Sequence, residues 1–321
     1  MSNGTRPRRR GLRAIGVVAL AAVGLALAST GANLALEAAE RSSIAPYGEK
    51  VQVRGGSLNV FRTGTAGPTI VLLSGYGTAA PALDFAPLIR ALGHYRVIVV
   101  EGFGYGYSDM SAGPRTVENV SAELHEALSK LVDEPYILAG HSIAGFYTLY
   151  YANRYPHEVS AVIGIDPTVP TAMAEAPGAR EPGGLDPERM LSTTGLVRWA
   201  TSITPALAEP AGDAFTASER ERIRLMTSWN FANPASIAEG TEMAGNAWKL
   251  QGVTYPDGLP VLDFLSRDSV DSMPGWLPAH ERQLRNVRRH ELVVLEGGHY
   301  LHWTQSAAIA KKITEFLAQG E

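Results

Sequence analysis

The segment LAGHSIAGF, at residues 138–146, contains a serine whose surroundings favour nucleophilic chemistry. The apolar run PYILAG leads into it and a helical pattern follows it, so Ser142 occupies a predicted strand-to-helix turn. Small residues at Gly140 and Ala144 allow the backbone to bend sharply while the hydroxyl projects into a cleft. Ser142 is therefore the candidate nucleophile. The alternative interpretation is that it only caps the N-terminus of a buried helix.

A serine hydroxyl becomes a useful nucleophile only when a base takes up its proton. The segment LVVLEGGHYLHW, residues 292–303, ends an apolar run with two glycines and then His299. A turn at the glycines would place this histidine at the carboxyl end of a sheet, where ligands of open α/β sheets bind. We expect His299 to be the base, His302 to be a structural hydrogen-bonding residue, and His141 to pack against the site or line it.

The base in turn needs a carboxylate that fixes its tautomer and stabilises the imidazolium. Asp268 follows the strand-like run PVLDFL and is the expected acid. The alternatives are Asp166, which ends the run AVIGID, and Asp271. Asp263 is a weaker candidate because it would lie in mid-strand and would need a buried partner. The order serine, aspartate, histidine is the chain order of the α/β-hydrolase triad.

Acyl transfer also needs hydrogen-bond donors for the oxyanion that develops on the attacked carbonyl. The backbone N–H of Ile143, next after the candidate nucleophile, is one expected donor. The other is the N–H of Tyr76, in the segment SGYGT, where Gly75 and Gly77 let the backbone approach a substrate. The alternative is a glycine-rich turn without function.

The remaining pattern indicates the elements that must position these residues. Four continuous apolar runs, at 69–74, 96–100, 136–140 and 161–166, alternate with helical patterns, which predicts a mostly parallel, doubly wound sheet. A hairpin precedes them from Val51. Strand-like runs are then missing until residue 259, and the intervening segment contains helical patterns with N-cap signals. We expect a hydrolase-type core at 46–166 and 259–321, with a helical cap inserted at 167–258.

Composition narrows the function further. Hydrophobic residues make up 45% of the 321, enough for a sizeable core, and there is no cysteine, which excludes disulfides and thiolate chemistry. Outside the first 13 residues the chain holds 23 basic against 32 acidic residues, so we expect no nucleic-acid partner. No metal-binding motif is visible, and we expect neither a metal nor a cofactor.

The N-terminus combines a basic segment with a long apolar one. Five arginines within residues 1–13 precede an uncharged run of 23 residues, Ala14 to Leu36, which as a helix would measure about 34 Å. That length spans a bilayer core of about 30 Å with the basic end inside, so the body would be exported on a membrane anchor. Because Ala26-Leu27-Ala28 also fits a signal-peptidase site, secretion after cleavage is the equal alternative. Residues 1–45 thus form a signal or anchor segment with a linker.

Together these motifs resemble the α/β-hydrolase superfamily over roughly residues 46–321, through LLSGYGT, EGFGYGYSD, GHSIAG, SRD and GGHYLHW. The chain is most similar to bacterial exported or membrane-anchored serine hydrolases of that fold. The resemblance implies a carboxylesterase- or lipase-like enzyme that works through an acyl-enzyme; the superfamily's epoxide and haloalkane branches use an aspartate where this chain has Ser142. Two positions depart from the common pattern, Ser74 in place of histidine and Glu101 in place of aspartate.

The substrate is less well defined by the sequence. We expect a small ester or amide with an apolar group, because the cap carries flexible Met and flat Trp side chains, although these would also suit the cap's own core. They are Met173, Trp199, Met226, Trp229, Met243 and Trp248. Alternative functions are an amidase or proline-iminopeptidase-like peptidase, a perhydrolase, and a non-catalytic exported binding module on the same fold.

Overall fold

The computed structural model of this chain describes residues 6–170 and 186–319, with side chains from residue 14 onward. Its centre is an eight-stranded sheet in the order β1-β2-β4-β3-β5-β6-β7-β8. The hairpin and its contact with β4 are antiparallel, and all other neighbours are parallel, as the sequence predicts. The strands are β1 (Glu49–Val53), β2 (Gly56–Thr63), β3 (Thr69–Leu73), β4 (Arg96–Glu101), β5 (Tyr136–His141), β6 (Val159–Ile165), β7 (Val261–Ser266) and β8 (His290–Leu295).

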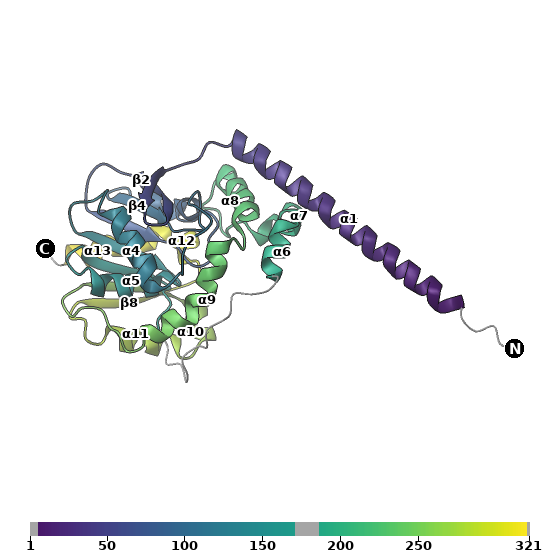
Figure 1. Ribbon diagram of the computed structural model, residues 1–321. Coiled ribbons are helices and arrows are strands. Elements are labelled where there is room, and N and C mark those ends of the chain that lie inside the picture. Colours follow the sequence, from purple (N-terminus) through teal and green to yellow (C-terminus); the bar gives the residue numbers. More distant parts are fainter. Residues whose placement is uncertain (1–5, 171–185, 320–321) are drawn as a thin grey trace.

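Helices cover both faces of the sheet, which is why its central strands are apolar on both sides (Figure 1). One core joins the sheet to α4 (Val117–Leu128) and α5 (Ala144–Arg154), while a second joins it to α3 (Ala86–Ala91) and α13 (Ser306–Ala318). Short helices fill the loops: α2 (Pro81–Asp84), α10 (Arg267–Ser272), α11 (Trp276–Leu284) and α12 (Leu301–Thr304). The predicted α/β-hydrolase architecture is confirmed.

Between β6 and β7 the chain forms a separate group of helices, to which we refer as the cap. Its elements are α6 (Pro187–Thr193), α7 (Leu196–Ile203), the 3₁₀ turn η1 (Pro205–Leu207), α8 (Ala217–Asn230) and α9 (Pro234–Lys249). The N-cap signals work as expected: Thr216 and Glu219 form a capping box, and Asn233 caps α9 ahead of Pro234. The cap rests on the loop after β3 through a third core that contains Met226 and Trp229.

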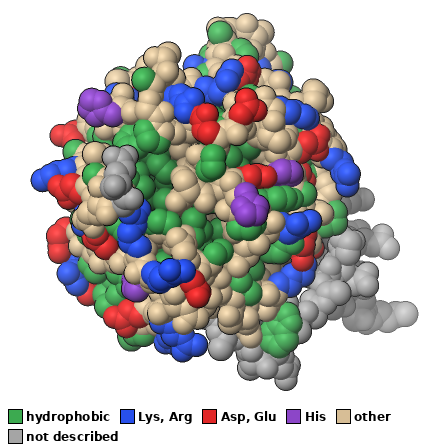
Figure 2. All heavy atoms as spheres, turned by 90° about the vertical axis from the view of Figure 1, so that its left-hand side faces the viewer, with side chains coloured by type: hydrophobic (Ala, Val, Ile, Leu, Met, Phe, Trp, Pro, Cys, Tyr) green, Lys and Arg blue, Asp and Glu red, His purple; other side chains and the backbone are tan. Residues whose placement is uncertain are grey.

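The N-terminal helix α1 (Arg6–Ser43) extends away from the rest of the molecule (Figure 1). From Ala14 to Ser43 it is long and apolar enough to cross a membrane, and the side chains of its most apolar stretch are not buried within the protein. Leu20 and Leu25, for example, are both more than 70% exposed. The hydrogen bonds between α1 and the cap begin at Ser29 and continue to Glu40, in the C-terminal half of the helix. The opposite face of the molecule carries interspersed basic and acidic side chains (Figure 2).

Candidate active site

Ser142 stands at the sharp turn between β5 and α5. Its φ of 54° is left-handed, which is uncommon for a residue with a side chain and is typical of a nucleophile held in a strained turn. The small neighbours are sterically required. A Cβ on Gly140 would come within 3.1 Å of the backbone of Ala144, and one on Gly145 within 2.5 Å of the Thr168 carbonyl oxygen. The sequence pattern around the serine therefore corresponds to a turn that bulkier residues could not form.

His299 lies on the loop after β8, and its ring packs 4.7 Å from the ring of His141, the residue before the serine. Its Nδ1 forms a hydrogen bond of 2.7 Å with Oδ2 of Asp166. This bond occupies Nδ1 and leaves Nε2 to act toward a substrate or a nucleophile. His299 is a little over one-third exposed, whereas Asp166 is fully buried. His299 and Asp166 are thus arranged as a partly exposed imidazole oriented by a buried carboxylate.

The expected acid, Asp268, is not the partner of His299, and the sequence prediction is corrected here. The strand β7 ends at Ser266, whose hydroxyl accepts the N–H of Ser269 and so begins α10 immediately. That helix turns Asp268 to the exposed surface, where its backbone N–H meets the Gly297 carbonyl at 3.3 Å. Asp271 is also exposed and lies near Arg267. The alternative carboxylate, Asp166, takes the place beside the histidine.

The position and the charge of the Asp166 carboxylate are set by its backbone turn and by the hydrogen bonds that it accepts. It follows β6 with a φ of 44°, which bends the chain toward the β8 loop. Besides His299, its carboxylate accepts hydrogen bonds from the Ser266 N–H, the Ser269 hydroxyl and the Trp276 indole. Burial alone would raise the pKa of Asp166, but these hydrogen bonds, led by that from His299, lower it below the ordinary value. The carboxylate is therefore ionised at neutral pH.

The other histidines near the site have structural surroundings. His302 is buried and its Nε2 bonds to Asp84 at 2.7 Å, in agreement with the structural hydrogen-bonding role expected for it. His141 is buried as well and makes a 3.2 Å contact from Nε2 to the His299 carbonyl oxygen. Burial, together with the neighbouring His302 and His299, holds the pKa of His141 well below its usual range. His141 is thus a neutral support for the loop that carries His299.

The loop after β3 carries Tyr76, one of the two expected oxyanion donors, and lies close to the Ser142 turn, which carries the other, Ile143. A Cβ on Gly75 would meet Ser142 Cβ at 3.0 Å and His141 Nδ1 at 2.7 Å, so only glycine lets this loop lie so close to the serine. In the part of the chain that the structure describes, no backbone hydrogen bond uses the N–H of Tyr76 or of Ile143. The two N–H groups are thus not committed to a backbone acceptor there, as expected for donors to a substrate oxygen.

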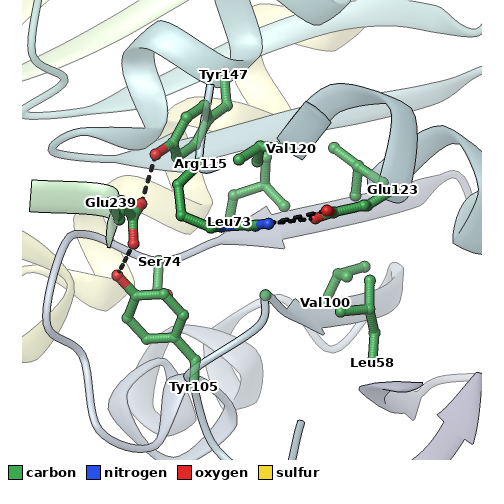
Figure 3. A pocket seen from close by; sticks show the side chains of 12 residues that line it. Leu58, Leu73, Ser74, Val100, Tyr105, Arg115, Val120, Glu123, Tyr147 and Glu239 are labelled. Atoms are coloured by element: carbon green, nitrogen blue, oxygen red, sulfur yellow. Dashed lines mark hydrogen bonds and ion pairs between the residues drawn. The ribbon is translucent and has the colours of Figure 1, made fainter. Parts of the chain in front are cut away.

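A buried polar cluster that the sequence analysis missed holds this loop from the cap side (Figure 3). Glu239, on α9, accepts hydrogen bonds from the hydroxyls of Tyr105 and Tyr147. The Tyr105 oxygen also accepts the N–H of Gly77, at 3.2 Å, so one phenol connects the cap helix α9 to the loop after β3. Burial raises the pKa of Glu239. An acidic residue in the otherwise apolar start of α9 was the available signal for this cluster.

The cluster borders a cavity of about 50 Å³, lined also by Ser74 and Arg115. Arg115 is buried and pairs with Glu123 at 2.9 Å. The lining of this cavity contains neither Ser142 nor His299, so the cavity is distinct from the space next to those two side chains. Among residues 6–170 and 186–319, no three His, Asp or Glu side chains gather in a way that could hold a metal ion.

The apolar side chains that were expected to favour an apolar substrate have other surroundings. Met226 and Trp229 belong to the third core, and Met243 packs against the first. The Trp199 indole donates to Ser29 on α1, and Trp248 is partly exposed. Met173 lies outside the described residues. The alternative interpretation, that these residues build the cap itself, describes Met226 and Trp229 correctly.

Comparison with known proteins agrees with this architecture. A family model described as "alpha/beta hydrolase fold" matches residues 68–305. Among curated proteins, the uncharacterized protein YbdG of Bacillus subtilis is 38% identical over 125 residues, a match that spans 38% of each chain. A putative non-heme chloroperoxidase of Synechocystis sp. is 24% identical over 263 residues, covering 78% of this chain and 92% of that protein.

Solved structures show the same fold. Cfl2 from Burkholderia cenocepacia superposes with a TM-score of 0.66 at 19% identity, covering 84% of this chain and 94% of that one. The carboxylesterase CesB from Bacillus subtilis gives 0.59 at 18% identity, covering 92% and 98%. The family match extends from just before β3 to the end of α12 and includes the serine turn and the histidine loop. The chain therefore belongs to the α/β-hydrolase fold family.

Proposed function

We propose that this protein is a serine hydrolase that cleaves carboxylic esters, with Ser142 as nucleophile, His299 as base and Asp166 as the carboxylate that orients it. The observation that carries the proposal is the 2.7 Å bond between His299 and buried Asp166, next to a serine in a left-handed turn. A serine that only capped a helix would need neither a glycine-lined approach nor an oriented histidine.

The geometry supports a two-step reaction. Ser142 Oγ attacks the ester carbonyl carbon as its proton passes to Nε2 of His299, and the oxyanion is stabilised by the N–H groups of Tyr76 and Ile143. The C–O bond then breaks, and the imidazolium gives its proton to the departing alcohol. Water attacks the acyl-enzyme, its proton passes to His299 and then to Ser142 Oγ, and the acid is released. Throughout, ionised Asp166 stabilises the imidazolium.

One relative favours a second candidate from the same site. The similar protein from Synechocystis is named a putative non-heme chloroperoxidase, and a perhydrolase would use the same acyl-enzyme with peroxide in place of water. An amidase selective for a substrate amine has less support, since Glu239, the buried cap carboxylate, is already bound to two tyrosines. A binding module without turnover would not need the oriented histidine.

We also propose that α1 anchors the enzyme in a membrane, with the catalytic domain outside. The supporting observation is that its apolar stretch lies uncovered by the rest of the protein, which an ordinary core helix would not do. The arginines that precede it favour retention of the N-terminus on the inner side.

Hydrolysis of p-nitrophenyl esters of increasing acyl length, by wild type and by Ser142→Ala, tests the catalytic proposal. We expect turnover that the variant loses, with a length optimum that measures the acyl pocket. A second arm adds hydrogen peroxide together with acetate, whose acyl group would pass to Ser142 with loss of water and then to peroxide as peracetic acid, and follows halide oxidation by that peracid. A folded wild type that hydrolyses no ester of the series would refute the esterase assignment, and oxidation that depends on Ser142 would then favour the perhydrolase.

A further inference from the structure

The segment of α1 from Ser29 to Glu40 is joined to the cap by polar contacts. Ser29 donates to the Thr194 carbonyl at 2.5 Å, and Asn33 accepts from Arg198 at 2.7 Å. Further along the helix, Glu40 pairs with the same arginine at 2.6 Å and accepts the Trp229 indole at 2.7 Å. Helix α1 therefore contacts the first turn of α7, through Arg198, and the C-terminal end of α8, through Trp229.

These contacts are buried and sterically specific. Asn33 and Arg198 are each less than 5% exposed. Gly195 has a φ of 77°, and a Cβ there would meet the Asn33 side chain at 2.8 Å, so the start of α7 lies directly against α1. Separating Arg198 from Glu40 and Asn33 would leave a buried charge unpaired, which is costly. The direction of α1 relative to the cap is consequently fixed.

Helix geometry then determines which part of the cap lies at the bilayer surface. If the hydrocarbon region begins at Ala14, directly after the last arginine, a core of about 30 Å ends about 20 residues later, near Asn33. This is the residue that contacts Gly195 and Arg198. The corner between α6 and α7 must therefore stand at the outer boundary of the membrane.

The side chains at this corner are suited to such a boundary. Met190 and Leu191 on α6 and Leu196 on α7 are 50%, 43% and 51% exposed. Apolar side chains on one surface beside an apolar helix are typical of segments that lie in the headgroup and acyl boundary. The corner contacts α1 at Ser29 and Asn33, next to the uncovered apolar stretch of that helix, so one bilayer can cover both.

We infer that the corner formed by Met190, Leu191 and Leu196, referred to here as the membrane corner, inserts into the outer boundary of a phospholipid bilayer. The inference rests on the anchoring proposed above and adds a second point of contact to it. With α1 and the corner both engaged, the cap is held at the lipid surface, and the site beneath it takes its substrate there.

Ile203 supplies a matched control on the same helix. It is 82% exposed and apolar, yet it ends α7 next to Ser202, which contacts Arg224 on α8. On α8, Arg222 reaches the Ala45 carbonyl, at the end of α1 remote from the membrane. Ile203 thus tests whether an exposed apolar side chain of this cap partitions into lipid regardless of its position.

Because the chain has no cysteine, single labels can be introduced cleanly into the full-length protein. Leu196→Cys and Ile203→Cys, each carrying the environment-sensitive probe NBD, are reconstituted into vesicles of phosphatidylcholine and phosphatidylglycerol with and without doxyl-labelled acyl chains. Flotation measures anchoring, and emission and quenching measure depth. We expect both proteins to float, with quenching about threefold stronger at position 196 and a blue-shifted emission there alone, as for side chains buried about 5–10 Å into the boundary.

The two proposals fail in different ways. Floating proteins with equal quenching at both positions, weak or strong, would overturn the membrane corner and leave the anchor intact. Proteins that remain in the soluble fraction, with an intact mass beginning near Ser29, would overturn both. A third variant adds Met190→Asp and Leu191→Asp to the label at position 196. If it still floats and melts normally but its probe is only weakly quenched, the result supports insertion of the membrane corner.

Discussion

Replacement of the two competing carboxylates separates the roles that the structure gives them. In Asp166→Asn the amide retains the size of the side chain but removes the charge that accepts the Nδ1 proton of His299 across the 2.7 Å between Nδ1 and Oδ2. The imidazole is then free to adopt the tautomer in which Nε2 carries the proton and cannot act as a base. In Asp268→Asn, an exposed side chain changes without any contact to the ring.

The expected magnitudes differ widely. Loss of the orienting carboxylate in a serine triad lowers kcat by about 10⁴-fold, which corresponds to about 5 kcal/mol of transition-state stabilisation. Asp166 also accepts from Ser266, Ser269 and Trp276, so its replacement leaves buried donors facing an amide and costs about 1–3 kcal/mol of folding stability. For Asp268→Asn we expect less than about 0.5 kcal/mol in either quantity.

The assay is hydrolysis of a short p-nitrophenyl ester under saturating conditions, with urea unfolding of both variants to correct for the folded fraction. We expect a large fall in kcat for Asp166→Asn with little change in KM, and near wild-type values for Asp268→Asn. If Asp268→Asn lost activity while folded Asp166→Asn retained it, the assignment of the acid from the hydrogen bond would be refuted.

Three further predictions follow from other parts of the molecule. Gly75→Ala places a Cβ 3.0 Å from that of Ser142 and should lower kcat about tenfold or more by displacing the oxyanion donors, whereas Gly113→Ala, with open space around it, should leave ester hydrolysis unchanged. Glu239→Ala removes the acceptor of two buried phenols and should cost about 1–3 kcal/mol in urea unfolding together with a fall in kcat as the Gly77 turn loosens; Glu242→Ala on the same helix is the control. Burial raises the pKa of Asp263 from 3.8 to about 6, so its contribution to stability is greatest below about pH 4 and is lost as the pH rises through about 6. At neutral pH the free energy of unfolding of Asp263→Asn, measured with urea, should therefore exceed that of wild type by up to about 3 kcal/mol. The difference should shrink on acidification. A difference independent of pH would show that Asp263 is not the titrating group.

The parts of the site that depend on local sequence could be predicted. The turn at Ser142 needs small residues at fixed positions, and the two glycines before His299 mark the loop after the last strand. Both features are encoded within a few residues, and the structure places both side chains at the same end of the sheet. The parallel order of the strands followed from their continuous apolar runs in the same way.

Which aspartate pairs with His299 depends on tertiary geometry. β6 and β7 are neighbours, so Asp166 and Asp268 follow adjacent strands at the same edge. The choice is made by backbone direction: a left-handed φ turns Asp166 inward, while a helix that begins at Arg267 turns Asp268 outward. A sequence in which both aspartates follow strand patterns does not contain this distinction.

Contacts of long sequence separation were likewise beyond the pattern. Tyr105 and Glu239 are 134 residues apart in the sequence, and they meet because the cap packs against the loop after β3. The same holds for Arg198 and Asn33, 165 residues apart, which join the cap to α1. The composition of the N-terminal segment predicts a signal or an anchor, yet the C-terminal part of α1 also packs against the cap helices α7 and α8.

The most direct test of the central claim is covalent labelling by a fluorophosphonate, which reacts only with an activated serine. Full-length wild type, Ser142→Ala and His299→Ala are treated in parallel, and the modified peptide is located by mass spectrometry. We expect one adduct, on Ser142, which is absent in Ser142→Ala and strongly reduced in His299→Ala. A folded wild type that forms no adduct, or an adduct on another serine that persists in both variants, would contradict the assignment of Ser142 as the nucleophile.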